Sequence, residues 1–166
     1  MWHTILKYGL IAGGVVGSIL FGTTVAFAGK HPPLAIGMVI GFSSMLLALS
    51  AVFVGIKHHR DHQLGGVIRF WPAFGMGLAI SFIAGVMYVL AWEAATAVTQ
   101  MDFAAEYSRL IIDEAKAKGI TGAALEKQIA EMKAFAESYK NPFYRMPITF
   151  TEIFPVGILV SLVSAG

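Results

Sequence analysis

Two long stretches without any charged residue or histidine constrain this chain more than any other feature. They cover residues 35–56 and 72–92. Each is longer than the about 20 residues that an α-helix needs to cross a hydrocarbon layer about 30 Å thick. The whole chain is only 13% charged, against about 25% in soluble domains. The sequence therefore predicts an all-α, polytopic membrane protein.

We predict four transmembrane helices in a single membrane domain, at about residues 5–28, 34–56, 70–98 and 148–166. The first segment is similar to a signal peptide, with a short basic start and a small-x-small triplet at its end. Its apolar run is longer than the usual 7–15 or so residues of a signal core, and we expect it to be retained. The last segment ends without a polar flank, and we expect the natural chain to continue beyond Gly166.

Residues 100–145 differ in character from the rest of the chain. The segment 99–147 carries seven acidic and seven basic side chains, which suits contact with water. Apolar residues recur at helical spacing in two runs separated by Gly119, which is a natural helix stop. We therefore predict an αα-hairpin outside the membrane, inserted between the third and fourth spans.

Orientation follows from the basic residues near the span ends. Lys7, Lys57, Arg60 and Arg69 would all lie on one side of the bilayer, while the turn after the first span contributes only Lys30. Because basic residues are enriched on the cytoplasmic side, both termini are predicted to be cytoplasmic. The hairpin is then expected on the opposite side.

The hydrophilic segment GIKHHRDHQLGG, residues 55–66, is a candidate metal site. His58 and His62 are four residues apart, which could place two imidazoles on one helical face, and Asp61 could add a third ligand. The chain has no cysteine, so no thiolate ligand is available. We favour a plain cytoplasmic turn, with Gly65 and Gly66 supplying backbone freedom, and we expect no metal and no other cofactor.

Glu152 and Glu93 are the two acids next to apolar runs, and acids inside membrane spans are candidates for function. Thr149 and Glu152 have the spacing of a capping box, which predicts that Glu152 caps the fourth span at the membrane interface. A binding or proton-carrying role is the alternative. Glu93 is expected to be solvated at the same boundary, where it could share a site with Glu152.

Small residues recur at spacings that favour close helix packing. Gly9, Gly13 and Gly17 lie four residues apart in the first span, as do Gly37 and Gly41 in the second. This small-xxx-small pattern lets two helices approach closely. Several serines are expected to hydrogen-bond between helices: Ser43, Ser44, Ser50, Ser81, Ser161 and Ser164.

Three motifs give the chain a family resemblance. The first follows the second span and continues into the third; the second is YKNP at 139–142; the third is TFTEIFPVG at 149–157. Together they resemble a bacterial inner-membrane family catalogued as domain of unknown function 4199. The resemblance implies four spans, an extramembrane loop between the last two and a short C-terminal tail, but no activity. Its motif positions here are Lys57, Arg60, Asp61, Gly65, Gly66, Phe70, Ala73, Phe74, Thr149, Phe150, Glu152, Phe154, Pro155, Val156 and Gly157.

These observations favour a non-enzymatic accessory or scaffolding subunit that lies in the lipid bilayer and binds another membrane protein or a second copy of itself. An oligomeric channel or transporter that uses Glu152 is the alternative. A membrane enzyme acting on envelope substrates is less favoured, because few titratable groups share one depth. Nucleic acid is not an expected partner, since the net charge of +2 forms no basic stripe.

Overall fold

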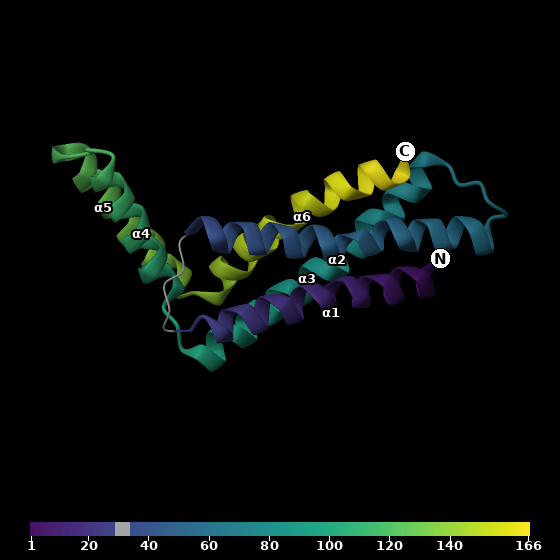
Figure 1. Ribbon diagram of the computed structural model, residues 1–166, viewed down its shortest axis with the longest axis horizontal. Helices are drawn as coiled ribbons and strands as arrows, with labels where there is room; N and C mark the ends of the chain where they lie inside the picture. The colour runs from purple at the N-terminus through teal and green to yellow at the C-terminus, as the bar shows by residue number, and fades with distance from the viewer. Residues whose placement is uncertain (29–33) are drawn as a thin grey trace.

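The computed structural model describes residues 1–28 and 34–166, and within them the chain forms six α-helices and no strand (Figure 1). The predicted all-α class is confirmed. The helices are α1 (Trp2–Ala26), α2 (Leu34–Gln63), α3 (Phe70–Thr99), α4 (Phe103–Ala117), α5 (Gly122–Tyr139) and α6 (Pro142–Ala165).

Four of these helices are long and apolar enough to cross a bilayer: α1, α2, α3 and α6. The protein is therefore a multi-pass membrane protein, with α4 and α5 between the third and fourth spans. The second span is longer than predicted, because α2 continues past Ile56 to Gln63. His58 and His62 consequently lie on the last turns of a helix and not in a loop.

The fourth span also begins earlier than predicted, at Pro142 instead of residue 148. The Asn141 side chain accepts a hydrogen bond from the Phe143 N–H at 3.0 Å, and proline fits the first helical turn, where no N–H is needed. Pro147 and Pro155 both lie inside α6. Each removes one backbone hydrogen bond from the helix.

The spans form a bundle in which α3 is the central helix. It packs along α1 and α6, while α2 contacts α1, α6 and α3. The two chain ends and the loop between α2 and α3 lie at one end of the bundle, and the α4–α5 hairpin leaves the opposite end (Figure 1). The largest fully buried apolar side chains, Leu49, Met76, Ile80 and Ile153, come from α2, α3 and α6.

The hairpin is an appendage of this bundle. Its helices pack on each other, and the Ser108 hydroxyl donates to the Met132 carbonyl at 3.3 Å. Gly119 and Gly122 flank the turn with φ of +79° and +62°, values that favour glycine. Among the described residues, the hydrophobic core contains side chains from the four spans and none from α4 or α5. The bundle core is therefore complete without the hairpin.

The glycines of α1 lie against α3. A Cβ added to Gly9 would come within 2.8 Å of the Ile83 Cβ, and one added to Gly13 within 2.5 Å of the Met87 sulfur. For Gly17 the nearest atom would be the Ala91 Cβ at 3.2 Å. The four-residue spacing thus corresponds to a close helix contact.

Gly37 and Gly41 of α2 differ from the α1 glycines. An added Cβ at either position would meet nothing within 4 Å among the described residues. The packing role predicted for Gly37 and Gly41 therefore has no counterpart within the described chain and stays a prediction. The spacing identifies a smooth helix face, but no helix of the described chain covers it.

A second close contact joins α3 to α6 through four small residues that we call the glycine–serine seam: Gly77, Ser81, Gly157 and Ser161. Gly77 faces the Ser161 side chain, and Gly157 faces Ser81, with 2.8 and 2.6 Å to an added Cβ. The Ser81 hydroxyl donates to the Gly157 carbonyl at 3.3 Å and lies 3.4 Å from the Ser161 hydroxyl. These two serines make the interhelical contact that was predicted for them.

Candidate functional site

The polar residues of the bundle gather where the hairpin joins it. Side chains from α3, α5 and α6 meet there and bond to one another. We call this group the polar cluster: Tyr88, Trp92, Glu93, Tyr139, Arg145 and Glu152. Each member lies on or at the end of a helix, so the three helices fix its position.

An ion pair between Glu93 and Arg145 forms one side of the polar cluster. The Arg145 guanidinium donates from Nε to Glu93 Oε1 at 2.7 Å and from Nη2 to Oε2. Both side chains are largely buried, with 19% and 17% of their surfaces exposed. Arg145 Nη1 also donates to the Tyr139 carbonyl at 3.4 Å, at the end of α5. The prediction that Glu93 is merely solvated is wrong, because Arg145 binds it in a two-point geometry.

Trp92 and Tyr139 tie the hairpin to α3. The Trp92 indole Nε1–H donates to the Tyr139 hydroxyl at 3.0 Å, and both residues are buried. Phe103, the first residue of α4, packs edge-on against Trp92 with 5.0 Å between ring centroids. Burial raises the pKa of the Tyr139 phenol, so the hydroxyl stays protonated at neutral pH. The base of the hairpin is therefore both aromatic and hydrogen-bonded.

Glu152 lies deeper than predicted and does not cap a helix. It stands ten residues after Pro142, about 15 Å along α6 at the helical rise. The Thr149 hydroxyl donates to the Arg145 carbonyl at 3.1 Å, so it does not form a capping box with Glu152. Instead, the Tyr88 hydroxyl of α3 donates to Glu152 Oε2 at 3.3 Å. No ion pair to Glu152 occurs within the part of the chain that the structure describes.

The two acids belong to one cluster but have separate partners. Glu93 is bound by Arg145, whereas Glu152 is bound by Tyr88. No direct contact between Glu93 and Glu152 among the described residues therefore supports the hypothesis that the two acids share one site. Of the two, Glu152 is the acid whose charge is unbalanced, and a proton or a cation could balance it.

The histidine segment lies at the opposite end of the bundle from the polar cluster. The His58 and His62 rings stack with 4.4 Å between centroids, as their four-residue spacing predicts, but Asp61 pairs with Arg60 at 2.7 Å. Lys57 is exposed one turn earlier. In residues 1–28 and 34–166, no group of three or more potential metal ligands occurs.

A glycine turn follows the histidine helix end. Gly65 and Gly66 adopt φ of +67° and +94°, and the Gly66 N–H donates to the Arg60 carbonyl at 2.9 Å. These conformations favour glycine because a Cβ would be strained there. The turn predicted for this segment is confined to its last residues, because α2 extends to Gln63.

Sequence reasoning missed four members of the polar cluster: Tyr88, Trp92, Tyr139 and Arg145. One signal was present, since Glu93 and Arg145 carry opposite charges at the same predicted boundary. Another was the YKNP motif, whose first residue is Tyr139. Chemically, the cluster can hold the hairpin in place and can exchange a proton at Glu152. The Ser81 and Ser161 hydroxyls are engaged with each other and with the Gly157 carbonyl, which suits packing and not nucleophilic attack.

Comparison with known proteins gives one match. No curated protein and no solved structure matches the chain. A family model described as "Protein of unknown function (DUF4199)" matches residues 7–166, which include the hairpin, the polar cluster and the histidine segment. This agrees with the resemblance found in the motifs. The chain therefore belongs to the DUF4199 family of membrane proteins of unknown function.

Proposed function

We propose that this protein is a non-enzymatic accessory subunit of the bacterial inner membrane that binds a partner protein through the α4–α5 hairpin. The observation that carries the proposal is the contrast between how firmly the hairpin is held and how little it adds to the core. Arg145, Trp92 and Tyr139 fix its base, yet the described core contains none of its side chains. A hairpin that is held at its base but adds no side chain to the described core is better explained by a role in binding a partner than by a role in stabilising the bundle.

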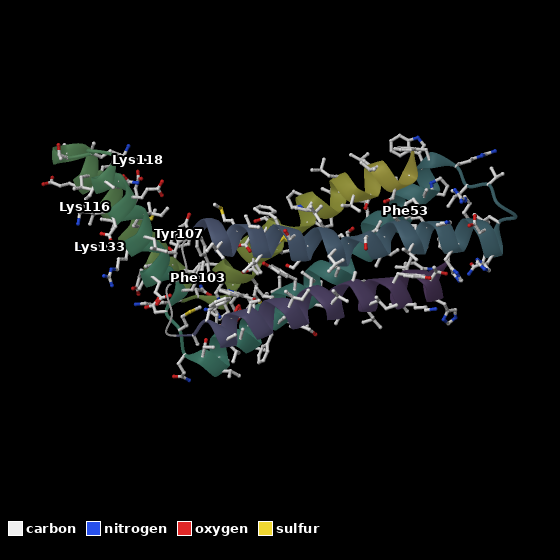
Figure 2. All side chains as sticks on the ribbon, viewed as in Figure 1. Phe53, Phe103, Tyr107, Lys116, Lys118 and Lys133 are labelled. Atoms are coloured by element: carbon white, nitrogen blue, oxygen red, sulfur yellow. The ribbon has the colours of Figure 1, made fainter. Side chains whose placement is uncertain are left out.

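The surface of the hairpin supports the same proposal. Two helices cannot bury a full apolar stripe on each other, and Leu110 is 40% exposed, while Ile111, Ile129 and Met132 are only half-buried. A third helix or a folded partner would cover them. The hairpin also carries exposed lysines, among them Lys116, Lys118 and Lys133 (Figure 2).

The proposed orientation places the hairpin outside the cytoplasm. Lys7, Lys57, Arg60 and Arg69 belong to helices and a loop at the end of the bundle that holds both termini. The positive-inside rule then favours a cytoplasmic position for that end. The partner would accordingly be periplasmic or have a periplasmic part.

A photo-crosslinking amino acid at Leu110, in native membranes, tests the proposal. We expect one discrete crosslinked product with another protein, identified by mass spectrometry. The matched probe at Lys116 should give far less of it, because the helical period places Lys116 on another side of α4 from Leu110 and Ile111. Equal products from both positions would contradict binding through the apolar side. Crosslinked products that contain only two copies of this chain would indicate self-association instead of a separate partner protein.

A transporter or channel is the second candidate, and Glu152 is the observation that favours it. A carboxylate inside a span, bound by one tyrosine hydroxyl, can take up a proton or a cation. Purified protein in liposomes should then show proton or cation flux that is lost in Glu152→Gln. Flux that persists in this variant would exclude the role of the acid, and absence of flux in the unaltered protein would exclude the class.

A further inference from the structure

A cleft of about 270 Å³ lies between the bundle and the hairpin. One wall is the corner between α3 and α4, with Gln100, Asp102 and Phe103, and the other is the corner between α5 and α6, with Tyr139, Lys140 and Arg145. Phe103 lies at the junction of hairpin and bundle (Figure 2). The cleft is close to the lower limit of about 300 Å³ for small-molecule sites, which suits a small polar group.

The two walls carry charges of opposite sign that do not pair with each other. Asp102 Oδ1 accepts the Ala105 N–H at 3.0 Å, which leaves its second oxygen available as an acceptor. Lys140 contacts Glu137 at 2.7 Å and has two further N–H donors. The hydrogen bond and charge of Glu137, and to a smaller extent the charge of Asp102, raise the pKa of Lys140. Asp102 and Lys140 line the same cleft from its two walls.

Each wall of the cleft contributes one aromatic ring, Phe103 on the acidic side and Tyr139 on the basic side. The Phe103 and Tyr139 rings have centroids 5.8 Å apart, and both residues line the cavity. Ring faces attract ammonium groups, and the effect is stronger where water is displaced. The Arg145 guanidinium already lies over the Tyr139 ring, 5.8 Å from its centroid. Asp102 beside the Phe103 ring therefore favours a ligand cation, while Lys140 and Arg145 favour a ligand anion.

The position of the cleft indicates where such a ligand comes from. It lies between the end of α3 at Thr99 and the start of α6 at Pro142, which are the ends of two candidate spans. Phe143 and Tyr144, on the first turn of α6, are 88% and 43% exposed, as aromatic residues at the headgroup level often are. These features favour a position of the cleft at the level of the lipid headgroups.

We propose that this cleft binds the ammonium–phosphate zwitterion of a phosphatidylethanolamine headgroup. Lys140 and Arg145 hold the phosphate, and Asp102 with the Phe103 ring holds the ammonium. A ligand with both charges would satisfy both walls at once, whereas an anion alone would meet the Asp102 carboxylate. Glu93 remains bound to Arg145, whose two unused N–H donors are enough for one phosphate oxygen.

Native mass spectrometry of the full chain in detergent, with defined lipids added, tests this inference. We expect phosphatidylethanolamine to be retained over phosphatidylglycerol, which has the phosphate but no ammonium. Lys140→Gln should weaken phosphatidylethanolamine binding about tenfold, the effect of losing one charge-assisted hydrogen bond. Asp102→Asn should abolish the preference between the two lipids, and asparagine still caps α4. Lys118→Gln is the matched control, because Lys118 forms the same 2.7 Å pair with an acid but lies at the hairpin tip.

Soluble phosphoethanolamine distinguishes the headgroup from the whole lipid. If it displaces the lipid, the headgroup alone is the ligand; if it does not, while Lys140→Gln still weakens lipid binding, the site takes the headgroup only as part of a lipid. Equal retention of the two lipids by the unaltered protein would overturn the proposal. Lys140→Gln that behaves as Lys118→Gln would overturn it as well.

Discussion

Among the contacts between helices α3 and α6, two have opposite chemistry. Toward the chain ends they meet at the glycine–serine seam, where small side chains let the backbones approach closely. Toward the hairpin they meet in the polar cluster, where an ion pair and a tyrosine–glutamate hydrogen bond join them. The glycine–serine seam is stabilised by close packing of small side chains, because lipid provides little hydrophobic driving force for association between helices. The polar cluster depends on charge and direction, and it alone also holds the hairpin.

Enlarging the seam should have the largest effect. Gly157→Leu would force side-chain atoms into Ser81, because even a Cβ at position 157 comes within 2.6 Å of the Ser81 Cβ. We expect a loss of about 3 kcal/mol or more, at the upper end for overpacked cores, measured by thermal unfolding in detergent. Gly41→Leu is the control and should leave the melting temperature nearly unchanged, since its surroundings are open. Equal effects of the two substitutions would show that the seam is not a tight contact.

Breaking the ion pair should have a smaller but more specific effect. Arg145→Met leaves Glu93 largely buried without a partner. Fully buried pairs lose about 3–5 kcal/mol in this situation, and we expect about 2 kcal/mol here because both side chains keep some exposure. Glu93→Gln combined with Arg145→Met should cost less than the sum of the two single substitutions. Additive losses would mean that the pair contributes little coupling energy.

Removing single hydrogen bonds should have the smallest effects on stability, but it should show which of the two contacts holds the hairpin. Trp92→Phe loses the donor to Tyr139 and should cost about 1 kcal/mol. It should also speed proteolysis of the hairpin, which Tyr139 anchors. Ser81→Ala loses the longer seam bonds and should cost about 0.6 kcal/mol without changing the cleavage of the hairpin. Trp71→Phe serves as the control, because Trp71 is 74% exposed. Faster hairpin cleavage in Ser81→Ala would contradict the division between the contacts.

Much of the fold was predictable because the bilayer imposes a simple rule on composition. The charge-free stretches predicted the spans, and the amphipathic runs predicted the hairpin. Helix ends were less predictable, since α2 continues through polar residues to Gln63 and Asn141 starts α6 well before its apolar run.

The contacts of the candidate site were the least predictable. The Glu93–Arg145 pair joins residues 52 positions apart, and the Tyr88–Glu152 pair joins residues 64 apart. The local sequence pattern does not predict such pairs, because they depend on how whole helices pack against one another. The same limit explains the glycines: identical spacing in α1 and α2 has a covering helix in one case and none among the described residues in the other.

The central place of α3 has a consequence for synthesis of the protein. Ribosomes deliver the chain from its amino end, so α1, α2 and α3 are all present before α6 is made. The packing of α1 on α3 can then form early, while the opposite groove of α3, lined by Gly77, Ser81 and Gly85, stays empty. Helix α6 must then enter that groove after α4 and α5 have been made. Until it does, Glu93 lacks its arginine partner, because Arg145 belongs to α6.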